Sequence, residues 1–335
     1  MSFTYPIINS KSIKMADQSK YIWFNGKIVP WENAKIHVMS HILHYGSGVF
    51  EGIKCYGTIK GPAIFRLEDH VDRLFLSGKK YGIQIPFSKI DIIKACIETV
   101  QVNDFKDCYI RPIAFYGSDT LGVHPKDCPV EVAIASFYWG AYLGDKGLER
   151  GVNITISPWK KFSLDSFPPS AKASGQYLNS MLAVQDARNR GYDEALLLNQ
   201  KGDIAEGSGQ NIFIVKDNTI YTNDENASIL MGITRDTIIK LCKKLNYNVN
   251  ITNLSKEMLF NSDEAFFTGS ATEVTPIASV DDTPISDGTP GNITLELKQL
   301  YENIIHGNDD RYHHWLTFVN APIPNNIPVL EDSEL

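Results

Sequence analysis

Long apolar runs, long basic runs and paired cysteines are all missing from this sequence of 335 residues. No stretch is apolar over the roughly 20 residues that a membrane-spanning helix needs, which excludes an integral membrane helix. Positive charge is not concentrated anywhere and the net charge is −7, so neither nucleic acid nor an anionic membrane is an expected partner. Internal repeats and low-complexity segments are absent as well, which excludes a solenoid.

Cysteine is scarce and scattered along the chain. The five cysteines are Cys55, Cys96, Cys108, Cys128 and Cys242, and none forms a CxxC pair. An odd, scattered set predicts reduced thiols instead of a disulfide framework, and it predicts no zinc or other metal site. We therefore expect a cytoplasmic protein, since residues 1–19 also lack the pattern of a secretory signal.

The residues that are present predict an ordinary globular protein with strands and helices mixed throughout. Hydrophobic residues make up 43% and charged residues 21%, and the length favours about two domains. Residues 21–30 carry a hairpin signal around Asn25-Gly26. Period-2 and period-3.6 patterns predict strands at 49–56, 108–116, 130–138, 152–157, 194–199, 211–215 and 265–268, and helices at 70–81, 90–102, 178–190, 234–245 and 294–306.

This mixture predicts an α/β (α+β) fold in two α/β domains. Residues 20–137 form the expected small domain, residues 138–148 a Gly-rich and aromatic interdomain loop, and residues 149–319 a larger domain. Residues 1–19 are an N-terminal extension, and residues 320–335 a C-terminal tail.

Lys172 stands among small residues in the segment 170–178, SAKASGQYL. A lone lysine is usually a solvated surface residue. The flanking Ala and Ser side chains leave room for a ligand, and a lysine in a partly dry pocket has a lowered pKa and forms Schiff bases. Such an amine suggests pyridoxal 5′-phosphate, which also needs a partner for its pyridine nitrogen and a phosphate-binding site.

Two downstream segments could meet these needs. Glu206 lies in the turn IAEGSGQN (204–211), where neighbouring glycines let the backbone approach a ligand closely. Alone, Glu206 would more often be a solvent-facing turn residue. Gly232, Ile233 and Thr234 precede a predicted helix, whose free backbone amides bind phosphate, although plain helix capping by Thr234 fits equally well.

Taken together, the motifs resemble those of the branched-chain amino acid aminotransferases, which belong to the pyridoxal phosphate enzymes of fold type IV. The resemblance runs in order from about residue 21 to about residue 319. Besides the segments above, it rests on YIWFNG (21–26), HVMSHILHYG (37–46), VFEGI (49–53), YIRP (109–112), WGAYLG (139–144) and GSATE (269–273).

The resemblance implies a cofactor site at the interface of the two domains. Lys172 would be the catalytic lysine that binds the cofactor and moves protons. Glu206 would pair with the pyridine nitrogen, Tyr177 would lie near the ring hydroxyl, and Arg73 would be the guanidinium partner of the phosphate. The remaining implied cofactor-binding residues are Gly232, Ile233, Thr234 and Ser270.

The resemblance also implies a substrate pocket that accepts both apolar side chains and glutamate. Arg111 would meet the side-chain carboxylate of glutamate, and strand alternation places it on the same face as Tyr109. The amides of Ser270 and Ala271, with Tyr109, would hold the α-carboxylate. The implied apolar wall consists of Tyr45, Phe50, Trp139 and Tyr142, with Val123 as a further member.

The implied activity is reversible, ping-pong amino transfer between L-leucine, L-isoleucine or L-valine and 2-oxoglutarate. The partners would be small molecules and further copies of the chain, in a dimer or hexamer whose pocket a neighbouring subunit completes. Three departures from the family pattern are Ser270 where Thr is commoner, Thr272 where Ala is commoner, and Leu121 where Met also occurs. They should shift substrate preference without abolishing the chemistry.

Three alternatives stay open. A D-amino acid aminotransferase and an aminodeoxychorismate lyase share the fold, the lysine and the cofactor. The Tyr109-x-Arg111 pair and the loop 139–144 favour the branched-chain enzyme over both. A pyridoxal phosphate-binding protein without turnover is disfavoured by the complete set of candidate residues around Lys172.

Overall fold

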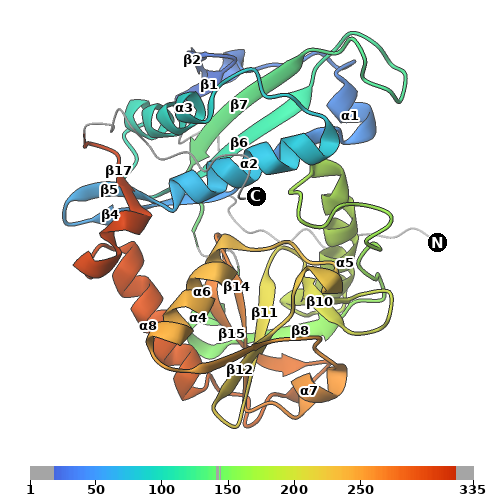
Figure 1. Ribbon diagram of the computed structural model, residues 1–335, viewed down its shortest axis with the longest axis vertical. Helices are drawn as coiled ribbons and strands as arrows, with labels where there is room; N and C mark the ends of the chain where they lie inside the picture. Colours follow the sequence, from blue (N-terminus) through green and yellow to red (C-terminus); the bar gives the residue numbers. More distant parts are fainter. Residues whose placement is uncertain (1–18, 141–142, 144, 322–335) are drawn as a thin grey trace.

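The computed structural model describes residues 19–140, 143 and 145–321, and two β-sheets with packed helices dominate this part of the chain (Figure 1). The first sheet is antiparallel, in the order β17-β5-β4-β6-β7-β1-β2, with β3 also pairing with β6. Its strands are β1 (Tyr21–Phe24), β2 (Lys27–Pro30), β3 (Gly48–Phe50), β4 (Ile53–Thr58), β5 (Gly61–Phe65), β6 (Cys108–Tyr116), β7 (Val130–Phe137) and β17 (Leu316–Phe318).

The second sheet is mixed, in the order β10-β9-β8-β15-β14-β11-β12-β13, with β16 also pairing with β15. The pairs β15–β8, β8–β9 and β12–β13 are parallel, whereas the other pairs are antiparallel. Its strands are β8 (Val152–Ile156), β9 (Glu194–Leu198), β10 (Ile204–Gly207), β11 (Asn211–Lys216), β12 (Thr219–Thr222), β13 (Asn248–Ile251), β14 (Glu264–Gly269), β15 (Glu273–Val280) and β16 (Thr283–Pro284).

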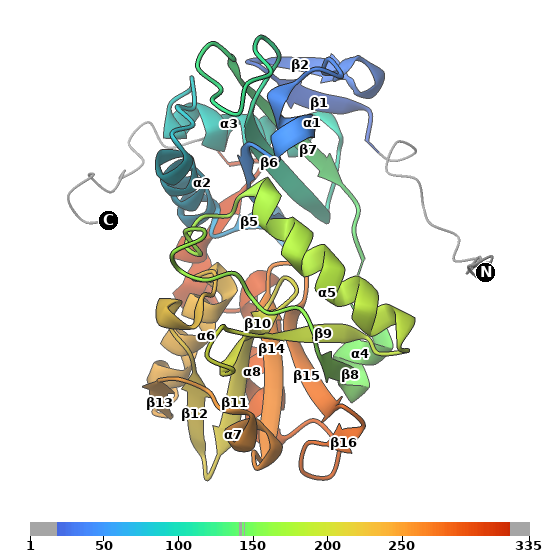
Figure 2. The same ribbon diagram turned by 90° about the vertical axis from the view of Figure 1, so that its right-hand side faces the viewer.

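Helices cover both sheets and lie between them. The α-helices are α1 (His41–Tyr45), α2 (Leu67–Tyr81), α3 (Lys89–Val102), α4 (Asp145–Arg150), α5 (Tyr177–Asn189), α6 (Ile233–Lys244), α7 (Lys256–Phe260) and α8 (Asn292–Ile305). Short 3-10 turns occur at Trp31–Asn33, Ser174–Gln176, Glu225–Ala227 and Asp310–Trp315. Figure 2 shows α5 running along the boundary between the two halves.

Local signals placed many of these elements correctly. The hairpin β1–β2 is confirmed, with Asn25 and Gly26 both at positive φ (45° and 90°), as a tight two-residue turn requires. Helix α2 ends at Gly82 in the left-handed conformation, and α3 begins at a capping box formed by Ser88 and Asp91. These signals act within a few residues, which is why the sequence alone reveals them.

The predicted strand 49–56 is wrong in its continuity, because the chain forms two strands, β3 and β4. The gap at Glu51 and Gly52 faces Pro112 of β6, which has no N–H group to continue the ladder of hydrogen bonds. The N–H of Glu51 still donates to the carbonyl of Pro112 at 2.9 Å. The same analysis also missed α1, α7 and the strands β5, β10, β16 and β17.

The two halves share a buried core. Tyr56, Phe65 and Leu316 of the first sheet pack in one cluster with Phe213, Ile238 and Leu297 of the second half. Strand β17, which the predicted boundary at 319 assigned to the second domain, pairs with β5 of the first sheet. The proposed domain limits remain a prediction, but this shared core fixes the crevice between the sheets.

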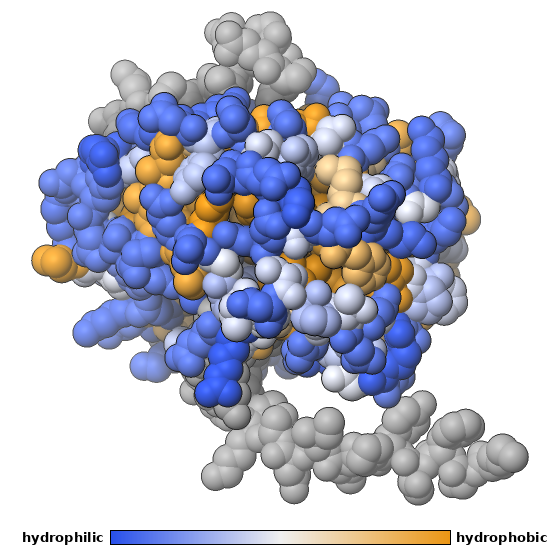
Figure 3. Space-filling model, turned by 90° about the horizontal axis from the view of Figure 1, so that it is seen from below, coloured by the Kyte–Doolittle hydropathy of each residue, from blue (hydrophilic) through white to orange (hydrophobic). Residues whose placement is uncertain are grey.

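Two surface properties complete the description. Within the described ranges, no helix combines the length and apolar character needed to cross a membrane. Seen from the end that carries the second sheet, the surface is largely hydrophilic, with apolar side chains in small separate areas (Figure 3). Scattered apolar side chains of this kind are usual on a solvent-exposed surface.

Candidate active site

The backbone of Lys172 is held between elements of the first half. The carbonyl of Lys172 accepts a hydrogen bond from the N–H of Phe50 at 3.0 Å, and its N–H donates to Oγ of Ser77 at 2.9 Å. The next residue, Ala173, forms a β-bridge with Val49. Strand β3 and helix α2 therefore fix the position from which the lysine side chain enters the crevice.

The amine of Lys172 is buried in an aromatic environment. Nζ donates to the hydroxyl of Tyr177 at 2.6 Å and lies 5.0 Å from the ring centre of Phe50. Burial, together with the positive charge of Arg73, lowers the pKa of Lys172 to about 8. Burial, followed by the nearby Glu206 carboxylate, raises the pKa of Tyr177 to about 12, so this phenol stays protonated. A substantial part of the lysine is thus neutral near physiological pH.

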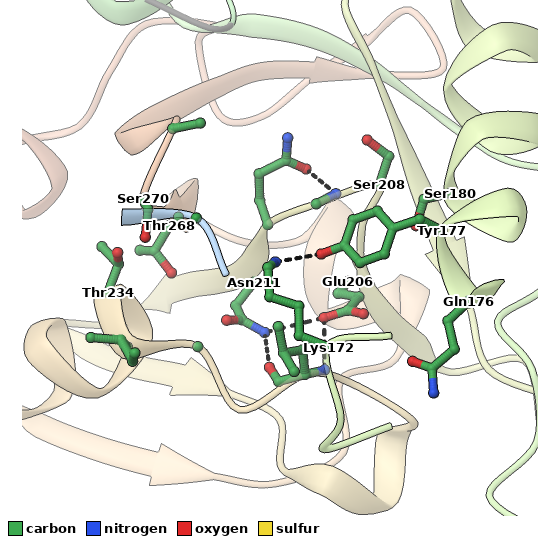
Figure 4. A pocket seen from close by; sticks show the side chains of 18 of the residues that line it. Lys172, Gln176, Tyr177, Ser180, Glu206, Ser208, Asn211, Thr234, Thr268 and Ser270 are labelled. Carbon is green, nitrogen blue, oxygen red and sulfur yellow. Dashed lines mark hydrogen bonds between the residues drawn. The ribbon is translucent and has the colours of Figure 1, made fainter. Parts of the chain in front are cut away.

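Glu206 is buried in β10 and fully engaged. Its Oε1 accepts from Nζ of Lys161 at 2.5 Å, while Oε2 accepts from the N–H of Leu230 at 3.0 Å and from Nδ2 of Asn211 at 3.3 Å. A carboxylate with these partners is held in one orientation in the crevice. Figure 4 shows Glu206 and Asn211 beside Lys172 and Tyr177.

These side chains line one cavity, which we call the inner cavity. All of the predicted cofactor-binding residues line it, namely Arg73, Lys172, Tyr177, Glu206, Gly232, Ile233, Thr234 and Ser270. Gly232 is the N-cap of α6, so free backbone amides of this 12-residue helix lie at the cavity wall.

Three hydroxyl side chains gather at this end of the inner cavity: Thr234, Thr268 and Ser270 (Figure 4). Thr268 is 1% exposed, and its Oγ1 has no hydrogen-bond partner among the residues that the structure describes. A buried hydroxyl without a partner is costly unless a ligand satisfies it. Together with the helix N-terminus and Arg73, it suits an anion such as a phosphate.

Arg73 is oriented by a buried acid. Glu51, which is 0% exposed, accepts from Nε and Nη2 of Arg73 at 2.6 and 2.8 Å and also contacts Nδ1 of His70 at 2.7 Å. Burial opposes ionisation, but Arg73 and His70 outweigh it and hold the pKa of Glu51 well below its usual range. Burial lowers the pKa of His70. Nη1 of Arg73 donates to the carbonyl of Met231, just before the α6 N-terminus.

A second, more open cavity of about 470 Å³, which we call the outer cavity, adjoins the first at Lys172 and Tyr177. The predicted substrate residues Phe50, Tyr109, Arg111, Trp139 and Ala271 line it, with Leu178, Met181 and Val184 of α5.

Aromatic rings surround the guanidinium of Arg111. This group lies 4.8 Å from the ring centre of Phe50 and 5.3 Å from that of Tyr109. In the described part of the chain, Nε of Arg111 has no hydrogen-bond partner. The outer cavity thus joins an apolar wall to one cation available for an anion.

Three predicted wall residues are not brought into these cavities. Tyr45 is 45% exposed and its hydroxyl donates to the carbonyl of Leu121, while Val123 is 78% exposed. Neither residue lines the inner or the outer cavity. Tyr142 lies outside the described residues.

Sequence reasoning also overlooked several site residues. Glu51 was only part of a matched stretch, Thr268 sat inside an apolar strand pattern, and Lys161 adjoins Lys160 with nothing to mark it. The close passage of Gly52 was overlooked too, since a Cβ there would lie 1.8 Å from the hydroxyl of Tyr109. Only the requirement for a buried partner of Glu206 could have suggested a second lysine.

Comparison with known proteins adds three findings. The family model described as "Amino-transferase class IV" matches residues 48–280. The chain is 43% identical over 304 residues to a branched-chain-amino-acid aminotransferase of Escherichia coli K12, covering 90% of this chain and 98% of the relative. It is 42% identical over 307 residues to the enzyme of the same description from Pseudomonas aeruginosa, covering 92% and 100%.

Solved structures agree with the sequence relatives. The branched-chain amino acid aminotransferase of the organism abbreviated T.th. has been solved in complexes with N-(5′-phosphopyridoxyl)-L-glutamate and with 4-methylvaleric acid. Each structure is 43% identical to this chain, with a TM-score of 0.86 and coverage of 90% of this chain and 99% of the other.

Proposed function

This chain belongs to the branched-chain-amino-acid aminotransferases of amino-transferase class IV, and on that premise we propose that it moves an amino group reversibly between L-leucine, L-isoleucine or L-valine and 2-oxoglutarate. The observation that carries the proposal is the outer cavity, where an apolar wall and a guanidinium with a partner-free nitrogen face the same lysine. The similar structures with a glutamate adduct and with 4-methylvaleric acid, an analogue of the leucine skeleton, support both halves of this account.

The inner cavity fits pyridoxal 5′-phosphate. Thr234, Thr268, Ser270 and the α6 amides would hold the phosphate with Arg73, and Glu206 would face the pyridine nitrogen. When bound, the cofactor supplies an electron sink for the substrate carbon. A carboxylate held by Lys161 and Asn211 can keep the pyridine nitrogen protonated, which strengthens that sink.

The chain's own residues supply proton transfer and orientation. Lys172, with its lowered pKa, can accept and return a proton at the substrate α-carbon near neutral pH. Tyr177 donates from a phenol that remains protonated, and it also fixes the amine at 2.6 Å. Phe50 and the rings around it exclude water from the reacting atoms.

The two substrates would use one pocket in different ways. The α-carboxylate of either substrate would bind the Ser270 and Ala271 amides and Tyr109. An aliphatic side chain would pack against Phe50, Trp139 and the α5 residues, whereas a glutamate side chain would bind Arg111. This assignment of roles explains how one cavity accepts both an apolar and an acidic side chain.

We further propose a homo-oligomer, dimer or hexamer, in which a second copy completes the pocket. Val38, Leu43, Tyr45, Leu121 and Val123 are large and exposed, and Tyr45 bonds to the carbonyl of Leu121. Such neighbouring apolar side chains are suited to an interface. A cytoplasmic location fits the five cysteines, which are all free and buried. Light scattering of the purified protein tests the assembly.

A single half-reaction tests the activity. The protein, loaded with pyridoxal 5′-phosphate, is mixed with L-leucine, D-alanine or aminodeoxychorismate, without any oxo acid, and the cofactor absorbance is followed. Conversion to the pyridoxamine form with L-leucine, and not with D-alanine, is the expected result. Conversion with D-alanine alone would assign a D-amino acid aminotransferase, and pyruvate release from aminodeoxychorismate would assign the lyase.

A further inference from the structure

The loop that joins β14 and β15 carries an unusual glutamate. Gly269 pairs with Glu273 across this hairpin, so Ser270, Ala271 and Thr272 form its three-residue loop. Glu273 adopts a left-handed conformation with φ +54°. Such loops normally place glycine at the left-handed position, because a side chain there is strained. Strain of this kind persists only where other contacts enforce it.

The contacts that enforce this conformation come from the other sheet. Oε1 of Glu273 accepts from Nζ of Lys54 at 2.6 Å and from the hydroxyl of Tyr56 at 3.1 Å. Both donors belong to β4, two residues apart and therefore on one strand face. The side chains of Lys54 and Glu273 are only 16% and 18% exposed, so the ion pair is largely shielded from water.

Tyr56 is suited to remain a donor. It is 4% exposed, and burial followed by the charge of Glu273 raises the pKa of its phenol well above the usual range. Its hydroxyl therefore stays protonated and can keep donating to Glu273. The hairpin loop is thus attached to the first sheet by two charge-assisted hydrogen bonds, which are stronger than neutral ones.

The loop that is anchored in this way faces the reaction site. Ser270 lines the inner cavity, Thr272 lines the outer cavity, and Ala271 lines both. A shift of this loop would displace its backbone amides relative to Lys172, which is held by β3 and α2 of the first half. Displacement of about 1 Å in such groups can cost about a hundredfold in rate or binding.

We propose that Glu273 is a positioning residue, which holds the loop 270–272 at the correct distance from Lys172 by bonding across the crevice to Lys54 and Tyr56. The inference rests on the proposed function, in which the amides of Ser270 and Ala271 bind the substrate carboxylate. Glu273 itself touches neither substrate nor cofactor. Its effect is therefore expected on carboxylate binding more than on the proton transfers of Lys172.

Glu273→Gly tests the proposal, because glycine removes the anchor and also relieves the backbone strain. The holoenzyme is assayed for kcat and KM with L-leucine and 2-oxoglutarate, and for the inhibition constant of 4-methylvalerate, which carries the carboxylate but no amine. We expect KM and the inhibition constant to rise about tenfold or more, the equivalent of one lost hydrogen bond to a charged group, with a smaller change in kcat.

Glu264→Ala is the matched control. Glu264 lies at the other end of β14 and accepts three hydrogen bonds from Ile293 and Thr294 at the start of α8. This variant should unfold at a lower temperature but keep the wild-type KM. Glu273→Gln retains an oxygen acceptor for Lys54 and Tyr56 and should recover most of the affinity. Should Glu273→Gly not fold, Tyr56→Phe provides a milder variant with a smaller rise of the same constants.

Two outcomes are decisive. A folded Glu273→Gly, or Tyr56→Phe in its place, with KM and inhibition constant unchanged would overturn the positioning role. Equal increases of KM in Glu273→Gly and Glu264→Ala would overturn it too, since both changes would then act through general loosening. Failure of the wild-type enzyme to transaminate L-leucine would instead refute the proposed function, and it is recognised in the same experiment.

Discussion

The inner and outer cavities share Lys172 and Tyr177 but are built in different ways. In the inner cavity, charged groups are already paired: Glu206 with Lys161, and Arg73 with Glu51. In the outer cavity, the main cation is Arg111, which lies against aromatic rings with Nε unpartnered among the described residues. A group that stays bound through every turnover can be met by a fixed set of partners. A pocket that alternates between two substrates needs groups that remain available.

Removal of the lysine shared by both cavities should have the largest effect. Lys172→Ala should lower turnover of leucine with 2-oxoglutarate by at least about 10²–10⁴-fold, the range for a lost acid–base group. Lys161, the other lysine of the inner cavity, is paired with Glu206 and cannot take its place. Initial rates of glutamate formation measure the loss. Lys160→Ala, which removes an exposed lysine of the same region, should keep normal rates. Normal turnover in Lys172→Ala would refute the central assignment.

Breaking a charge pair of the inner cavity tests whether that cavity is preorganised. Lys161→Met leaves the Glu206 carboxylate buried without its cation, so the free energy of unfolding should fall by about 3–5 kcal/mol and pyridoxal phosphate should bind more weakly. Urea unfolding of the apoprotein and cofactor titration measure both. Lys216→Met breaks an exposed pair with Asp263 and should change stability far less. Similar losses in the two variants would argue against preorganisation by buried charge.

Arg111→Ala tests the outer cavity and should separate the two substrates. KM for glutamate should rise about 10–150-fold, the worth of hydrogen bonds to a charged group, whereas KM for leucine should change only a few-fold. Steady-state kinetics in both directions give the comparison. Arg111→Lys keeps the charge and should restore part of the glutamate affinity. Equal losses for both substrates would contradict the account of one pocket with two uses.

The mildest prediction concerns a shift in pH dependence. Labelling of the apoprotein with an amine-reactive reagent, read by peptide mass spectrometry, should reach half its maximum near pH 8 at Lys172. At Lys216, hydrogen bonded to Asp263, the pKa is raised and labelling should need a higher pH. Half-maximal labelling of Lys172 near its ordinary value of 10.5 would show that its amine is solvated.

The same pKa shift has a defined sign in stability. Between pH 8 and 10.5, the unfolded chain still binds the proton of Lys172 that the folded chain has released. The contribution of this lysine to the free energy of unfolding therefore rises with pH across that window. Lys172→Met should remove this dependence, which urea unfolding at about pH 7.5 and at pH 10.5 can measure.

Local chemistry in the sequence determined a large part of this protein. Asn25-Gly26, the Ser88 capping box and Gly82 fix turns and helix ends, because their interactions reach only a few residues along the chain. Lys172 among small residues and the Gly232–Thr234 helix start identified the cofactor side for the same reason. The motifs in order then gave the family and the set of residues that the structure gathers around the inner cavity.

Only the tertiary structure decided the partners of those residues. Lys161 joins Glu206 across 45 positions, and Lys54 joins Glu273 across 219. The split between β3 and β4 depends on a proline in a different strand, and Tyr45 and Val123 lie on the surface instead of in the predicted wall. Such pairings depend on how distant segments pack, and burial makes them strong. A sequence pattern reports neither the packing nor the burial.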